Sequence, residues 1–285
     1  MPQSVSAPRD HREKTEHEFD IEARWRESLL GGASTEDFQH AYDELHAEFM
    51  DRQHGDADLY EKVNPRSSTE DRIRAVLLQV IGSGQDVLEV GTGDGRTACL
   101  LAEQGNKVTS VDVSRLALAQ ARERWGDLGL DLSFRFGDAR ALEFESETFD
   151  FCISENMVEH ISLEDMRAHL QEVKRLLNPG GSYLIYTPSR LWSGRVSVGF
   201  HLHVYTLREM CALLREYGFE TVWLEPRFLH RFGRIYPMSG LGLRLACLWE
   251  DMLSLLRVHR WPVKLRSKVL PSLMVRAIRE ETANG

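Results

Sequence analysis

Asp-Val-Leu-Glu-Val-Gly-Thr-Gly-Asp-Gly, at residues 86–95, is the stretch that decides the fold. An apolar strand-like run ends here in a turn with three glycines, and glycine lets a backbone approach a ligand closely. A second apolar run ends at Asp112, which stands 21 residues after Gly91. In a doubly wound α/β sheet, a carboxylate at the tip of the neighbouring strand accepts hydrogen bonds from ribose hydroxyls. The two features together predict a site for a cofactor that contains adenosine.

A dinucleotide and S-adenosylmethionine both contain adenosine, and the charges in the turn favour the second. A dinucleotide site has the pattern G-x-G-x-x-G, whereas this chain has Arg96 at the position of the third glycine. Glu89 lies in the strand before the turn and Asp94 lies within the turn. These carboxylates would repel a pyrophosphate, but they suit a ligand that carries an ammonium and a sulfonium group.

Later motifs repeat this pattern, in which polar residues stand directly after an apolar run. Residues 137–139 read Gly-Asp-Ala, and a carboxylate and a backbone amide there could hydrogen-bond the amine and a ring nitrogen of adenine. The fourth run ends at Glu155, and Val-Glu-His follows at 158–160. Further strand-like runs follow Leu-Asn-Pro-Gly-Gly at 177–181 and Gly218. Strands that alternate with helical segments predict an α/β sheet with its site at the strand ends.

Residues 86–225, about half of the chain, resemble the class I S-adenosylmethionine-dependent methyltransferases, and within them the ubiquinone-biosynthesis O-methyltransferase-like group. The matching motifs are VLEVGTGDG at 87–95, VDVS at 111–114, GDA at 137–139, VEH at 158–160, LNPGG at 177–181 and HVYT at 203–206. The resemblance implies a doubly wound, Rossmann-like sheet of seven strands in the order 3-2-1-4-5-7-6. It also implies S-adenosyl-L-methionine as the cofactor.

The resemblance further assigns contacts to the cofactor. The turn at 91–95 would hold the methionine part, Asp112 the ribose and Asp138 the adenine edge, while Glu155 would flank the cofactor. The full set of expected cofactor-binding residues is Glu89, Gly91, Thr92, Gly93, Gly95, Asp112, Val113, Asp138, Ala139 and Glu155.

Histidines near the strand ends are the candidates for chemistry, because methyl transfer to a hydroxyl usually needs a base or a metal. His160 is the candidate base, since it follows the fourth strand and an imidazole titrates near neutral pH; a helix-capping role is the alternative. Glu159 could orient His160 or bind a divalent ion. His201 and His203 share one face of an extended segment and could complete a metal site, but this spacing alone does not establish one. We therefore assign no metal and take His160, Glu159 and His203 as candidate catalytic residues.

Charge divides the chain into an acidic N-terminal part and a basic C-terminal part. Residues 1–72 carry 18 Asp and Glu against 9 Lys and Arg, whereas residues 226–279 carry 2 against 11. The expected organisation is a disordered tail at 1–15, a helical cover at 16–70, the cofactor-binding core at 71–226 and a basic helical extension at 227–285. The formal net charge of −9 disfavours a nucleic-acid partner.

The basic extension is expected to be amphipathic. An apolar stripe predicts one helix, and a second amphipathic stretch runs from Pro262 to Ile278. The residues of the stripe are Leu241, Leu245, Leu248, Trp249, Met252 and Leu255 or Leu256. Such an extension could make peripheral contact with an anionic membrane, or form a subdomain or dimer arm on the acidic N-terminal segment. An oligomer is therefore left open.

The motifs and the resemblance together predict an enzyme of small-molecule biosynthesis that moves a methyl group by in-line displacement. A hydroxyl oxygen of a phenolic or quinone-like small molecule is the expected acceptor. The alternatives are N- or C-methylation, a macromolecular acceptor, and a protein that binds the cofactor without turnover. Four cysteines without a C-x-x-C pair and an N-terminus without an apolar signal core favour a cytoplasmic protein.

Overall fold

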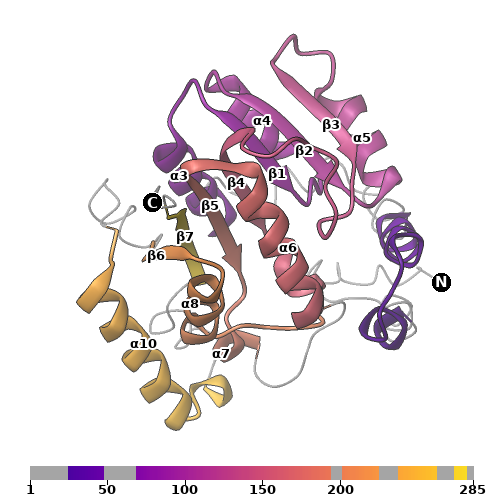
Figure 1. Ribbon diagram of the computed structural model, residues 1–285. Helices are drawn as coiled ribbons and strands as arrows, with labels where there is room; N and C mark the ends of the chain where they lie inside the picture. Colours follow the sequence, from indigo (N-terminus) through magenta and orange to yellow (C-terminus); the bar gives the residue numbers. More distant parts are fainter. Residues whose placement is uncertain (1–24, 48–68, 194–200, 225–236, 262–272, 281–285) are drawn as a thin grey trace, which may run out of the picture.

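A computed structural model describes residues 25–47, 69–193, 201–224, 237–261 and 273–280 of the 285-residue chain. Its centre is one sheet of seven strands in the order β3-β2-β1-β4-β5-β7-β6, which confirms the expected order (Figure 1). The strands β1 to β5 run parallel, whereas β7 runs antiparallel to β5 and to β6. The carboxyl ends of β1, β2, β3 and β4 therefore share one edge of the sheet.

The strands and helices alternate along the core. The strands are β1 (Asp86–Val90), β2 (Lys107–Asp112), β3 (Leu132–Phe136), β4 (Phe149–Glu155), β5 (Leu177–Thr187), β6 (Phe219–Trp223) and β7 (Leu273–Arg279). The helices are α3 (Thr69–Ile81), α4 (Arg96–Glu103), α5 (Arg115–Trp125), α6 (Leu163–Leu176), α7 (Arg190–Ser193), α8 (Leu207–Glu216) and α10 (Gly240–Leu255), with short 3₁₀ turns η1 (Val158–His160) and η2 (Val258–Arg260). Residues 25–30 and 35–47 are also helical.

The central strands β1, β4, β5 and β7 are buried on both faces of the sheet over most of their length, which is why they read as apolar runs, whereas the edge strand β3 is largely exposed. Successive side chains of a strand point to opposite faces, so Val87 and Leu88 enter two different clusters. The cluster around Val87 contains apolar residues of α3, α4 and α5. The cluster around Leu88 contains those of α6, α8 and α10. The site edge of the sheet is thus fixed between two packed helical layers.

The C-terminal extension differs from the expectation in one strand. Residues 273–279 do not continue a helical extension but form β7, which lies between β5 and β6. Tyr183 pairs with Ala277, and Thr221 pairs with the same residue from the other side. A mostly buried strand has no clear alternation that separates it from a buried helix, so the sequence pattern was ambiguous here. The core therefore does not end at 226, and the rest of the second predicted amphipathic stretch lies outside the described residues.

The helix expected from the apolar stripe exists as α10, but it packs with its other face. Leu243, Ala246, Cys247 and Leu253 are buried. The stripe residues Leu241, Leu245, Leu248, Trp249, Met252, Leu255 and Leu256 are exposed. The helix is apolar on both sides, so periodicity alone could not tell which face meets the core.

We expect Gly95→Ala to destabilise the protein because this turn packs tightly against α5. Gly95 has a φ of 75°, and a Cβ there would lie 2.9 Å from both Ala121 Cβ and Trp125 Cδ1. Left-handed backbone costs about 1–2 kcal/mol and overpacking about 1–3 kcal/mol, which predicts a melting temperature lower by roughly 5–15 °C. Thermal unfolding measures it. Gly84→Ala is the matched control, because Gly84 has the same φ of 75° and open space around it. Equal shifts in the two variants would contradict the packing argument.

Candidate active site

A cavity of about 250 Å³ opens at the carboxyl ends of β1, β2, β3 and β4. The helical residues 35–47 close its other side. Its lining consists of Phe38, Tyr42, Leu45 and His46 from that helix, Val90, Gly91 and Gly93 from the glycine turn, Val111, Asp112 and Val113 after β2, Gly137, Asp138, Ala139 and Arg140 after β3, and Glu155, Asn156, Met157, His160 and Ile161 after β4. Seven of the ten expected cofactor residues are in this wall: Gly91, Gly93, Asp112, Val113, Asp138, Ala139 and Glu155.

The glycine turn presents backbone rather than side chains to the cavity. Gly91 has a φ of 94°, and a Cβ there would lie 2.9 Å from Met157 Cβ. The N–H of Gly93 donates to Asp112 Oδ2 at 3.3 Å. Gly91 and Gly93 therefore form a part of the cavity wall in which the backbone can lie close to a ligand, as only glycine allows. Gly95 does not line the cavity and is the N-cap residue of α4.

Asp112 ends β2 with its carboxylate against the glycine turn. Besides Gly93, the N–H of Ser114 donates to Asp112 Oδ1 at 2.8 Å. Burial raises the pKa of Asp112, and the hydrogen bond from the Ser114 N–H and the charge of the nearby His46 oppose that rise. The carboxylate is thus held in one orientation at the place where the sequence predicted a ribose contact.

Two further carboxylates surround the turn. Glu89 is buried beneath it and does not line the cavity; Ser110 Oγ donates to Glu89 Oε2 at 2.5 Å and also lies 2.7 Å from Thr92 Oγ1. Burial raises the pKa of Glu89 to about 8, and the charges of Glu155 and other acids add to the rise. Glu155 lines the cavity and accepts a 2.7 Å hydrogen bond from Thr97 Oγ1. At a pKa near 8 Glu89 is mostly protonated at neutral pH, so Glu155 is the acid of the two that can favour a cationic ligand over a phosphate, with Arg74 Nη2 3.7 Å from its Oε1.

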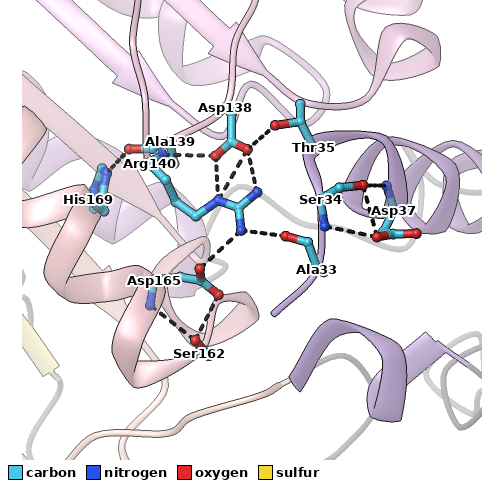
Figure 2. Close-up of polar contacts among 10 residues, drawn as sticks. All are labelled: Ala33, Ser34, Thr35, Asp37, Asp138, Ala139, Arg140, Ser162, Asp165 and His169. Carbon is cyan, nitrogen blue, oxygen red and sulfur yellow. Dashed lines mark hydrogen bonds and ion pairs between the residues drawn. The ribbon is translucent and has the colours of Figure 1, made fainter. Parts of the chain in front are cut away.

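Asp138 is engaged by a network that the sequence did not predict (Figure 2). Arg140 Nη2 and Thr35 Oγ1 both donate to Asp138 Oδ2 at 2.6 Å, and Arg140 Nε donates to Oδ1 at 2.9 Å. Burial alone would raise the pKa of Asp138, but these hydrogen bonds outweigh it and hold the pKa below its usual value. Asp138 therefore lies in the cavity wall, as expected for an adenine contact, with its oxygen atoms already bound to protein donors.

The same network fastens the covering helix to the sheet. Arg140 Nη1 donates to Ala33 O at 2.8 Å and to Asp165 Oδ1 at 3.1 Å, and its guanidinium lies 4.6 Å from the centre of the Phe38 ring. Ser34 caps the helix, because Asp37 N donates to Ser34 Oγ at 3.1 Å. Because Ser34 caps the helix, the Thr35 hydroxyl can donate to Asp138, which is 103 residues away in the sequence.

Asp43 holds the covering helix at a second point. Its Oδ1 accepts hydrogen bonds from Ser114 Oγ at 2.6 Å and from Leu116 N at 3.0 Å, at the start of α5. A carboxylate is favoured at the N-terminus of a helix. The cover is therefore tied to the sheet beside both the predicted ribose site and the predicted adenine site.

Glu159, His160 and His201 meet on the other side of the cavity. His160 lines the cavity, and its ring centre lies 5.0 Å from that of His201 and 5.9 Å from that of Tyr42. Glu159 is fully buried; its Oε2 accepts a 2.8 Å hydrogen bond from Thr187 Oγ1, and burial raises its pKa to about 7. Ligand atoms of the three residues lie within 4.8 Å of one another, so this cluster could hold a metal ion.

His203 lies apart from this cluster. Its backbone N–H donates to Glu159 O at 3.2 Å, but its ring packs 4.5 Å from the centre of the Tyr205 ring and does not line the cavity. Burial lowers the pKa of His203, and the charge of Arg190 lowers it further. The structure thus places His201, rather than His203, beside His160.

A family of proteins described as "Methyltransferase domain" matches residues 87–181 of this chain. A probable S-adenosylmethionine-dependent methyltransferase of Mycolicibacterium smegmatis is 31% identical over 48% of this chain and 53% of its own length. A ubiquinone biosynthesis O-methyltransferase of Coxiella burnetii is 26% identical over 68% of this chain and 75% of its own. The chain thus spans only about half the length of the first of these relatives.

Solved structures share the fold at low identity. The [4+2]-cyclase SpnF matches 77% of this chain and 85% of its own with a TM-score of 0.55 and 18% identity. Haemonchus contortus phosphoethanolamine N-methyltransferase 2, solved with S-adenosyl-L-methionine, matches 75% of this chain and 53% of its own with a TM-score of 0.52 and 22% identity. The motifs, the strand order and the family match agree that residues 87–181 resemble the methyltransferase domain of the class I S-adenosylmethionine-dependent enzymes.

Proposed function

We propose that the chain binds S-adenosylmethionine in this cavity and methylates a hydroxyl oxygen of a small molecule. The observation that carries the proposal is that one cavity joins the glycine turn and Asp112 to His160. The glycine turn suits the methionine part of the cofactor, Asp112 suits its ribose, and His160 can take a proton. The name of the Coxiella relative supports oxygen as the acceptor atom.

Different residues of the cavity bind the cofactor and remove the proton of the acceptor. The cofactor, once bound, supplies an activated methyl group, so the protein mainly has to align the reactants, which is worth on the order of 7 kcal/mol or more. Asp112 and the glycine turn orient the cofactor, while Glu155 favours its positive charge. His160 removes the hydroxyl proton as the new bond between the acceptor oxygen and the methyl group forms, and Glu159 orients His160.

The apolar part of the lining fits a planar acceptor. Phe38, Tyr42, Leu45 and Ile161 line the cavity together with Met157. Aromatic and aliphatic side chains of this kind bury an aromatic ring well. A phenolic or quinone-like small molecule is therefore the acceptor class that we propose.

N-methylation is the second candidate, because a structural neighbour of this chain is a phosphoethanolamine N-methyltransferase. A neutral amine needs no base to lose a proton before it attacks, so this reaction would depend less on His160. The same holds for an acceptor with a stabilised carbanion. A cofactor-binding protein without turnover is the third candidate.

Calorimetry with S-adenosylmethionine and S-adenosylhomocysteine tests the proposal. We expect both to bind with dissociation constants in the micromolar range, about −8 kcal/mol. Labelled cofactor and a panel of phenols, catechols and amines then identify the acceptor. Folded protein that binds neither compound, or that binds NAD instead, would overturn the proposed function.

A further inference from the structure

The outer side of α10 carries a continuous apolar face that no described part of the chain covers. In Figure 1 the helix lies at the edge of the molecule, beyond α8. Leu241 is 72% exposed and Leu255 is 84% exposed. The complete set, which we call the α10 face, is Leu241, Leu245, Leu248, Trp249, Met252, Leu255 and Leu256. At 100° per residue these seven side chains fall within an arc of about 120°.

The orientation of this face is fixed by contacts on the opposite side of the helix. Glu250 is buried, and it accepts hydrogen bonds from Ser189 Oγ at 3.1 Å and from Leu207 N at 2.6 Å. Asp251 pairs with Arg208 of α8 at 2.5 Å. The helix is therefore firmly docked, and its exposed apolar side is a property of the folded state. Contiguous exposed apolar surface of this extent marks an interaction site.

The charges around the α10 face point to an anionic partner. Arg244, Arg257 and Arg260 are exposed on or just beyond the helix. The two acids of α10 do not oppose them, because Glu250 is buried and Asp251 is ion-paired. The whole segment 226–279 carries 11 Lys and Arg against 2 acids, although the chain as a whole has a net charge of −9.

We propose that the α10 face docks onto the surface of an anionic lipid bilayer. A fixed helix with an apolar outer side and flanking arginines has the features of an interfacial helix. Among the described residues, none of the helices is long and apolar enough to cross a membrane. A symmetric dimer through the α10 face would bring the flanking arginines of two copies together, and their like charges would repel, whereas an anionic bilayer attracts them.

Docking would connect the lipid surface to the site. Glu250 accepts hydrogen bonds from Ser189 and from Leu207 at the N-terminus of α8. Leu202 lies between these two residues in the sequence, and its N–H donates to Glu159 O at 2.7 Å. The docked helix is thus linked to the cluster that contains His160. The inference about the surface does not depend on the proposed function, but with it the acceptor would be a lipid-soluble molecule.

Vesicle sedimentation with the full chain tests this proposal. Vesicles of phosphatidylcholine alone are compared with vesicles that contain phosphatidylglycerol, at low and at high salt. The test variant is Leu245→Ser/Leu248→Ser/Leu255→Ser, which changes only exposed side chains. Leu128→Ser is the matched control, since Leu128 is 52% exposed but lies outside the α10 face.

We expect the wild type and the control to sediment with the anionic vesicles, and the triple variant to lose at least tenfold in affinity. Binding should weaken at high salt. Absence of vesicle binding by the wild type overturns the proposal. So does equal binding to neutral vesicles, or a wild-type dimer that the triple variant converts to a monomer, because a second copy would then be the occupant. Cofactor binding, measured alongside, tests the site separately.

Discussion

Replacing Asp112 with asparagine weakens the binding of S-adenosylmethionine by about 100-fold or more in our expectation. A hydrogen bond to a charged group contributes about 1.5–3 kcal/mol, and Asp112 is placed to accept two from a ribose; each 1.4 kcal/mol is a factor of ten. The substitution also disturbs the turn, because Asp112 accepts from Gly93 N and from Ser114 N through different oxygens. An asparagine can satisfy only one of these donors and would point its own N–H₂ at the other.

Calorimetry with S-adenosylmethionine measures the loss, and thermal unfolding shows whether the variant is folded. Asp131→Asn is the control. Asp131 is exposed just before β3, so the substitution makes the same change in charge at a residue outside the cavity lining. We expect this control to bind like the wild type. If a folded Asp112→Asn protein also bound like the wild type, the ribose would lie elsewhere in the cavity.

The sheet and the cofactor side of the site could be predicted because their signals are local. A strand that ends in Gly91-Thr-Gly93 must turn at a positive φ, and a glycine there leaves room for a ligand whatever the rest of the chain does. The position of Asp112 likewise follows from the end of one strand, β2. The family resemblance then supplied the strand order, since it fixes which strand ends meet.

Features that depend on distant segments could not be predicted. Ser34 and Thr35 are both residue types that favour a helix N-cap, and only the tertiary packing reveals that Ser34 caps while Thr35 and Arg140 bind Asp138. β7 is separated from β6 by 49 residues, and its strand character comes from its two neighbours in the sheet. In α10 both sides are apolar, so the choice of the buried face rests on Glu250 and its partners on α8 and at Ser189.

The second prediction with a large expected effect concerns the candidate base His160. We expect His160→Ala to lower kcat by roughly 10²–10⁴-fold, the usual contribution of a general base, while the affinity for S-adenosylmethionine stays near that of the wild type. The affinity should hold because the predicted cofactor contacts come from the glycine turn and from Asp112, whereas His160 lies beside His201 and Tyr42. Single-turnover kinetics with the identified acceptor, together with calorimetry, measures the two quantities.

His203→Ala is the matched control, because the structure places that ring against Tyr205 and outside the cavity lining. We expect its kcat to remain close to that of the wild type. A metal chelator then distinguishes the two uses of the cluster: a base at His160 is insensitive to it, whereas an ion held by Glu159, His160 and His201 would be removed and turnover lost. Unchanged turnover in His160→Ala would exclude His160 as the base and favour an acceptor that needs none, such as a neutral amine.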